Sequence, residues 1–207
     1  KKTIVCMLLF ILFVGNAVAQ NLITNVYGRD IRSLNGKWNA IIDLYDQGRG
    51  MKVYRNQSPK GNTDFYEYSF QGGLRLNVPG DWNSQTPELK YYEGTVWYAR
   101  HFDAKRLTHK RQFLYFGAVS YRCRVYLNGA EIGSHEGGFT PFQIEVTDLL
   151  NEGENFIATV VPKMPYLPCH LTGGIMAVSH VMYYWSLPHK LIWKTISSNW
   201  IRNLPTG

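Results

Sequence analysis

Residues 125–155 of the chain read VYLNGAEIGSHEGGFTPFQIEVTDLLNEGEN, a stretch in which short strand-like segments alternate with residues suited to tight turns. The initial VYL has strand character, and Asn128-Gly129 supplies two residues that tolerate the positive φ angles of a type I′ turn. A second strand-like segment, 131–134, runs into Gly137-Gly138, and a third begins at Pro141-Phe142. This order predicts a β-hairpin followed by a further strand, an arrangement typical of antiparallel sheets.

The same character extends over the segment 20–161, where no part shows a sustained 3.6-residue apolar repeat. Short strand candidates instead recur between Gly, Asn and Pro residues, and this spacing favours a sandwich or jelly roll over a βαβ fold. The candidate strands include 38–44, 74–78, 95–102, 112–116, 121–127, 142–146 and 155–161. The polar segment 46–64 is predicted to form a surface loop. We expect one all-β domain with boundaries at 20 and 161.

Three motifs occur in a fixed order: NVPGDWN at 77–83, GTVWYARHF at 94–102, and the hairpin and loop described above. Together they resemble the N-terminal sugar-binding domain of family 2 glycoside hydrolases, which include β-galactosidases, β-glucuronidases and β-mannosidases. The resemblance covers roughly 31–161 and implies a galactose-binding-like jelly-roll β-sandwich. The segment LNGKW at 34–38 is similar to the family's opening strand, which implies that its Trp packs under the sheet.

The N-terminus has the three parts of a secretory signal peptide: Lys1-Lys2, an apolar run over 4–14, and the small-residue motif Ala17-Val18-Ala19. The apolar run is short for a membrane span, so an uncleaved anchor is the alternative and not the expectation. We expect residues 1–19 to be removed and the mature chain to be exported to a bacterial periplasm or secreted. After cleavage we expect no association with a membrane.

The net charge of +7 does not indicate a nucleic-acid partner. All fifteen Asp and Glu residues lie between Asp30 and Glu154, so the body is nearly neutral and the excess positive charge lies at the two ends. A nucleic-acid-binding protein would concentrate Lys and Arg on its folded body. We therefore expect no nucleic-acid partner.

Cysteine and histidine patterns indicate neither a disulfide framework nor a metal site. Cys6 lies in the predicted signal peptide and Cys169 in the C-terminal tail, whereas Cys123 fits a strand as a buried free thiol. His135 has no second ligand at metal spacing, so we expect it to form a hydrogen bond in a turn. No metal and no cofactor are expected.

The chain changes character after Val161, because residues 162–207 contain no Asp or Glu. Met and Trp have single codons, so a one-base shift of the reading frame fixes some new residues: Met176-Ala177 gives Gly and Trp193-Lys194 gives Glu. With permitted synonymous codons, 163–181 then reads DAVPTLPLDWWNYGGITRD, which resembles an acidic-aromatic segment of the family. We hypothesise an out-of-frame tail over 162–207 and a sandwich without its native closing strand. A genuine basic, aromatic tail that docks on a membrane or partner is the alternative.

The family resemblance implies a retaining mechanism with two Glu residues about 5–5.5 Å apart, one acting as acid/base and one as nucleophile. In the family both lie on a (β/α)₈ barrel far beyond this segment, and nothing in the chain matches their motifs. Glu131, Glu136 and Glu145 are therefore interpreted as solvated charges of strands and loops. We predict no catalytic residue in this chain, which we interpret as a fragment without the catalytic barrel.

The resemblance does imply a supporting role for the loop that follows the VPGDWN motif, since in the family this segment can reach the sugar pocket. Asn83 and Tyr92 are the candidate substrate-binding residues, because amides suit sugar hydroxyls and aromatic rings suit sugar CH faces. Trp82, Trp97 and Tyr98 also offer aromatic faces. Their alternating positions in strands favour a place in the core instead.

The sequence thus predicts the sugar-binding and scaffold domain of an exported family 2 β-glycosidase of the β-galactosidase or β-glucuronidase type. Its partner in the intact enzyme would be a β-linked glycoside or oligosaccharide. A free-standing carbohydrate-binding module is the alternative, and a structural adhesion module is a third possibility.

Overall fold

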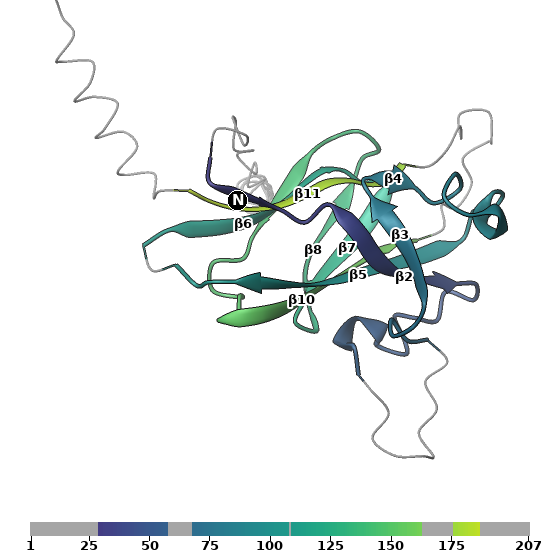
Figure 1. The fold of residues 1–207 in the computed structure, drawn as a ribbon, viewed down its shortest axis with the longest axis horizontal. Helices are drawn as coiled ribbons and strands as arrows, with labels where there is room; N and C mark the ends of the chain where they lie inside the picture. Colours follow the sequence, from purple (N-terminus) through teal and green to yellow (C-terminus); the bar gives the residue numbers. More distant parts are fainter. Residues whose placement is uncertain (1–28, 58–67, 108, 163–175, 187–207) are drawn as a thin grey trace, which may run out of the picture.

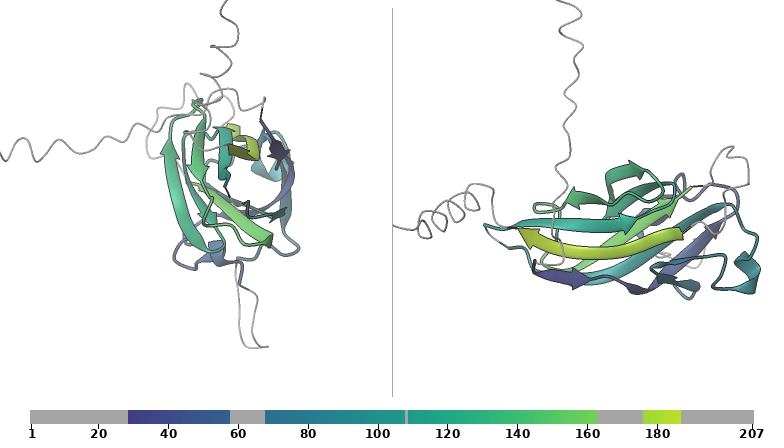
Figure 2. Two further views of the ribbon diagram at one scale, coloured as in Figure 1. Left: turned by 90° about the vertical axis from the view of Figure 1, so that its left-hand side faces the viewer. Right: turned by 90° about the horizontal axis from the view of Figure 1, so that it is seen from above.

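The computed structural model describes residues 29–57, 68–107, 109–162 and 176–186, the last of these by its backbone alone. Strands dominate the described residues and form two antiparallel sheets packed as layers (Figures 1 and 2). The predicted all-β sandwich is therefore confirmed. No helix in the described part of the chain is long and apolar enough to cross a membrane.

The larger sheet has six strands in the order β3-β2-β5-β10-β7-β8. Its strands are β2 (Gly36–Asp43), β3 (Leu74–Val78), β5 (Thr95–Ala104), β7 (Arg122–Leu127), β8 (Ala130–Glu136) and β10 (Gly153–Val161). The central strands β5 and β10 pair along nine positions, from Gly153 opposite Ala104 to Val161 opposite Val96. This long antiparallel pairing sets the register at the centre of the larger sheet.

The smaller sheet has the order β1-β11-β6-β9, with β4 paired to β11 beside this path. Its strands are β1 (Ile31–Ser33), β4 (Gly80–Asp81), β6 (Arg111–Ala118), β9 (Phe142–Glu145) and β11 (Met176–Ser186). In the part of the chain that the structure describes, two short 3-10 helices, η2 (Val53–Arg55) and η3 (Pro87–Leu89), lie in connections. The strand predictions made from the sequence are confirmed to within about two residues at their ends.

The core between the sheets is built from alternate residues of their strands, as period-two patterning requires. Trp38, Trp82 and Tyr98 are each at most 1% exposed and belong to this cluster, so the core interpretation of these rings is confirmed. Trp38 also donates from Nε1 to the Leu34 carbonyl at 2.7 Å. The predicted hairpin turn is present, with positive φ at both Asn128 and Gly129.

A second apolar cluster covers the outer face of the larger sheet. There Tyr54 stacks on Tyr126 with ring centroids 4.3 Å apart, and Trp97 lies 5.7 Å from Tyr126. Val53 is buried in the same cluster. The segment 46–57 was predicted from its polarity to be a surface loop, but part of it packs on the outer face of the sheet. The physical reason is that the Trp97 ring points outward from the sheet and is buried from water by this segment.

The structure differs from the expectation that the sandwich lacks its closing strand. Within the tail as written, β11 lies between β1 and β6, with Met182 opposite both Ser33 and Tyr115. The physical reason is that the gap between β1 and β6 can be filled by any extended backbone, and MAVSHVMYYWS is rich in β-branched and aromatic residues. The predicted signal peptide and most of the predicted tail lie outside the described residues.

Candidate functional site: the loop between β4 and β5

The loop between β4 and β5 is the segment in which the sequence placed the candidate sugar contacts. It lies at the end of the sandwich where β5 begins and β10 finishes (Figure 1). Trp82 anchors its start, because its indole is buried and Nε1 donates to the Tyr92 carbonyl at 2.9 Å. Leu89, at the end of η3, is buried in the core between the sheets. The loop is therefore fixed to the sandwich at two points.

Asn83 holds the two halves of this loop together. Its Nδ2 donates to the carbonyl oxygens of Leu89 at 2.7 Å and Tyr92 at 3.0 Å, and a longer contact of 3.4 Å reaches Lys90. An amide that satisfies several backbone carbonyls stabilises one loop conformation. The structure thus places Asn83 inside the loop as a brace, and its contact with sugar stays a prediction.

Tyr92 closes the loop onto β5. Its hydroxyl donates to the Thr95 carbonyl at 3.0 Å, and burial raises its pKa to about 12, with the nearby charge of Asp43 adding to the shift. The phenol therefore stays protonated and acts as a donor over the ordinary pH range. The structure brings Asn83 and Tyr92 into one hydrogen-bonded unit, as their shared loop suggested. Sugar binding by Tyr92 also stays a prediction.

Tyr91 is the aromatic residue of this loop that the sequence reasoning missed. It is 85% exposed, and the Nζ atom of Lys90 lies 5.4 Å from its ring centroid. Tyr91 lies in the turn after η3, which the hydrogen bond from the Tyr92 N–H to the Leu89 carbonyl closes at 2.9 Å. The pair Tyr91-Tyr92 alone gave no signal for which ring would face solvent.

The loop after β2 lies beside this one. Thr95 Oγ1 donates to Asp46 Oδ1 at 3.0 Å, which joins the two loops at the start of β5. Leu44 and Tyr45 in the neighbouring loop are 67% and 71% exposed. Large exposed side chains therefore gather on adjacent loops at this end of the sandwich.

The glutamates that the sequence analysis interpreted as surface charges are engaged in ion pairs. Glu131 pairs with Arg124 at 3.0 Å, Glu136 with Arg122 at 2.9 Å, and Glu145 with Arg111. The Arg111 hydrogen bonds lower the pKa of Glu145, which keeps that carboxyl ionised. A glycosidase acid needs the opposite, a raised pKa.

His135 and Cys123 take the ordinary places predicted for them. His135 Nε2 lies 3.0 Å from Thr140 Oγ1, its ring stacks on Phe142, and burial lowers its pKa. The free thiol of Cys123 is buried, which raises its pKa to about 12. Among the described residues, no group of three His, Cys, Asp or Glu side chains could hold a metal ion.

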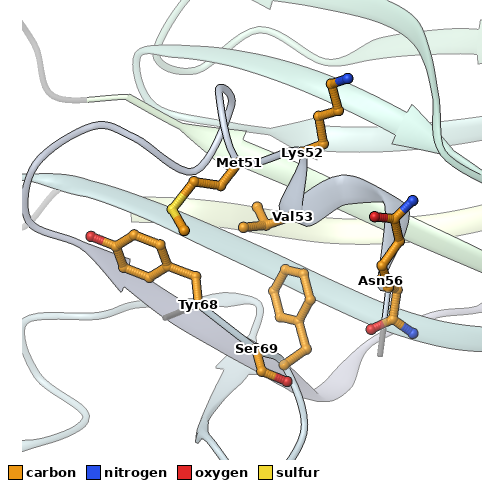
Figure 3. Close-up of a pocket in the computed structure, with 8 residues that line it drawn as sticks. Met51, Lys52, Val53, Asn56, Tyr68 and Ser69 are labelled. Carbon is orange, nitrogen blue, oxygen red and sulfur yellow. The ribbon is translucent and has the colours of Figure 1, made fainter. Parts of the chain in front are cut away.

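Two hollows lie elsewhere on the surface. A cavity of about 20 Å³, lined in part by Met51, Val53 and Tyr68, has room for about one water molecule (Figure 3). A cleft of about 600 Å³ at the opposite end of the sandwich from the β4–β5 loop is lined by residues that include Arg32 and Glu152. Because it carries charges of both signs, the cleft does not define a ligand class.

The comparison with protein families identifies the domain. The family model described as "Glycosyl hydrolases family 2, sugar binding domain" matches residues 31–171, which is most of the chain. The chain belongs to glycosyl hydrolase family 2. The resemblance seen in the sequence motifs is thereby confirmed, and the matched part of the family is its sugar-binding domain.

Individual relatives agree with this assignment. The chain is 29% identical over 136 residues to a β-glucuronidase of Paenibacillus borealis, covering 64% of the chain and 21% of the relative. It is 37% identical over 142 residues to a β-galactosidase of Thermoanaerobacter pseudethanolicus, covering 65% and 17%. A solved β-glucuronidase from an uncultured Clostridium species has a TM-score of 0.61 at 29% identity, covering 78% of the chain and 29% of that protein. The chain thus spans about a fifth of the length of these curated relatives.

Proposed function

We propose that this domain serves an exported family 2 β-glycosidase, in which it forms scaffold and one wall of the substrate site. In the intact protein the substrate would be a β-linked glucuronide or galactoside. The observation that carries the proposal is the family match over 31–171, which begins at β1 and includes the braced loop between β4 and β5. The jelly-roll connectivity expected from the family belongs to the same proposal.

The proposal assigns no catalytic role to the carboxylates described above. The retaining mechanism needs an acid/base and a nucleophile on either side of the scissile bond. Glu131, Glu136 and Glu145 are instead occupied by arginine partners on strands of the sandwich. Chemistry would therefore belong to parts of the protein outside this domain.

The test is to read the gene through the codon of Val161 and several hundred bases beyond it, and to express the complete reading frame. Expected is hydrolysis of nitrophenyl β-glucuronide or nitrophenyl β-galactoside by the long product, with no turnover by residues 20–207 alone. Turnover by the short product, abolished by replacing Glu131, Glu136 or Glu145, would contradict the proposal.

Export is the second part of the proposal. Its support is the arrangement of Lys1-Lys2, the apolar run 4–14 and Ala17-Val18-Ala19, which is that of a cleavable signal peptide. Removal of this segment would deliver the domain to a bacterial periplasm or to the medium. Substrate would then be met outside the cytoplasm.

A free-standing carbohydrate-binding module is the alternative function, and the exposure of Tyr91 is the observation that favours it. Such modules hold a sugar on exposed aromatic rings without any catalytic partner. A glycan array separates the two functions. Strong binding of glycans by the mature chain alone favours the free-standing module. No detectable binding on the array favours the enzyme domain, because its loop would contribute only part of a sugar site.

A further inference from the structure

We propose that Tyr91, braced by Asn83 and accompanied by Lys90, is the residue with which the loop contacts sugar. Its ring would stack on the CH face of one pyranose of a β-linked glycoside, and the Lys90 ammonium would meet a substituent of that pyranose. The inference rests on the proposed function, since it names the contact that the sugar-binding domain makes. In this proposal Asn83 and Tyr92 do not contact the sugar themselves. They are positioning residues that hold the loop in place.

The first step is the direction in which the loop residues face. The carbonyl oxygens of Leu89 and Tyr92 accept hydrogen bonds from Asn83, and the Tyr92 carbonyl also accepts one from the buried indole of Trp82. The Tyr92 hydroxyl is bound to Thr95. The backbone on either side of Tyr91 is therefore tied to the body of the domain, and its ring projects from this braced turn into solvent.

The second step is the exposure of this ring. Tyr91 is 85% exposed, while Tyr92 beside it is half-buried and packs against the core. A large aromatic side chain held in solvent gains little from the hydrophobic effect. An outward tyrosine ring on a braced backbone is a good binding element, because it has only two side-chain torsions to lose when a ligand packs on it.

The third step concerns the charges around the ring. Lys90 Nζ lies 5.4 Å from the ring centroid, a cation–π distance, and leaves the residue largely open to solvent. Glu88 and Glu93, both exposed, flank the same loop and offer acceptors for hydroxyl groups. A cation beside an exposed ring suits a sugar that carries a carboxylate or hydroxyl near Lys90, and the neighbouring carboxylates of the loop disfavour a long polyanion.

The experiment is a titration of the exported chain, carrying ¹³C-labelled tyrosine rings, with methyl β-D-glucuronide and separately with methyl β-D-galactoside. One ring offers few contacts, so we expect dissociation constants in the range of about 1–20 mM, too weak for a glycan array but measurable by chemical shifts. The Tyr91 signal, identified by its loss in Tyr91→Ala, should move and saturate.

Variants define the contact. Tyr91→Ala should weaken binding of both glycosides by about fivefold or more, whereas Tyr91→Trp should retain it. Lys90→Gln should weaken the glucuronide more than the galactoside. Tyr45→Ala is the matched control, since this ring is similarly exposed at 71% on the adjacent loop, and it should leave both affinities and the melting temperature unchanged.

Two results would overturn the inference. If the glycosides bind but shift other signals, and Tyr91→Ala binds like the parent, the sugar contact lies elsewhere while the family function stands. If neither glycoside binds at about 50 mM, this loop is not a sugar platform. Neither result bears on hydrolysis by the complete reading frame, so failure of the inference is distinguishable from failure of the proposed function.

Discussion

The Trp97 indole donates from Nε1 to Oδ2 of Asp43 at 3.0 Å, and both residues are only 1% exposed. The same carboxylate accepts the backbone N–H groups of Gln47 at 2.9 Å and Gly48 at 2.8 Å. One buried anion therefore ties the end of β2 to the central strand β5 and sets the path of the next loop. That loop in turn meets the start of β5 through Asp46 and Thr95.

Replacing Asp43 with Asn should destabilise the domain strongly. The amide offers one acceptor in place of two, so an NH₂ group would face a backbone or indole N–H donor in a buried site. We expect the free energy of unfolding to fall by about 2–4 kcal/mol, measured by urea denaturation. Asp148→Asn is the control. Its side chain is 85% exposed in an ion pair with Arg106, so it should change stability by about 0.5 kcal/mol or less.

Gly48 should tolerate no side chain at this junction. A Cβ atom built there would lie 2.5 Å from Trp97 Nε1 and 2.7 Å from Asp43 Oδ2, both inside van der Waals contact. Gly48→Ala should therefore destabilise by about 2 kcal/mol through displacement of the buried indole. Gly50→Ala is the matched control, because its nearest neighbour is the Gln47 carbonyl at 3.4 Å. Equal unfolding midpoints for the two variants would contradict this account of the junction.

The sequence predicted the strands well because period-two patterning and turn residues are local signals. The bounds of β3 agree at both ends, and Asn128-Gly129 forms its turn. The packing of the segment 46–57 over Trp97 was not predicted, because that segment has no apolar periodicity. Tyr54 stacks on Tyr126 through a tertiary contact that leaves no local sequence signal. Tertiary contacts of this kind override local polarity.

For the candidate site, sequence patterns indicate a loop, and sugar contact by Asn83 and Tyr92 stays a prediction. Family motifs located the segment after VPGDWN, and the structure places both Asn83 and Tyr92 in it. Which of two adjacent tyrosines faces outward depends on hydrogen bonds to the loop's carbonyl oxygens. Those bonds come from Trp82 and Asn83, whose side-chain directions no sequence pattern defines.

Stability should fall at alkaline pH through Cys123. Burial raises the pKa of its thiol from 9.0 to about 12, although a backbone hydrogen bond from His135 opposes the shift. The folded state therefore keeps a proton that the unfolded state loses above about pH 9. This contribution is complete below pH 9 and is lost as the pH rises towards 12, by at most about 1.4 kcal/mol per pH unit.

Urea denaturation at pH 8, 9 and 10 measures this effect. Cys123→Ala should be less stable than the parent at pH 8 because of the lost packing, and its deficit should shrink as the pH rises. Cys169 is present in both mature proteins and cancels in the comparison. A deficit that stays constant from pH 8 to pH 10 would show that the thiol does not titrate with unfolding.

Processing at the N-terminus should occur after Ala19. Small residues at 17 and 19 fit the cleavage site that follows a short apolar segment. Expression in an exporting bacterial host, followed by N-terminal sequencing of the product, should give Gln20 as the first residue. Ala19→Arg should block cleavage and retain the precursor. Recovery of exported parent protein that still carries Lys1 would make the segment an anchor.

The last prediction concerns the strand that closes the smaller sheet. Because β11 pairs with both β1 and β6, the sequence of this strand bears on the whole smaller sheet. The buried hydroxyls of Tyr98 and Thr159 have no hydrogen-bond partner among the described residues. By strand alternation, Thr159 faces the inner core together with Ile157 and Val161. The shifted reading frame would supply Thr and Arg in the segment that corresponds to β11, which are candidate partners for such groups.

We therefore expect the chain with its shifted-frame tail to unfold cooperatively and at a higher temperature than the chain as written. The written chain should be marginally stable or prone to aggregate, since domain stabilities are only about 5–15 kcal/mol and one poorly fitted central strand can remove much of that. Thermal unfolding and size-exclusion chromatography of the two proteins make the comparison, with a chain ending at Pro162 as the strand-free control. If the written chain melts as sharply and as high as the shifted-frame version, the out-of-frame hypothesis loses its structural support, because β11 as written would then be the native closing strand.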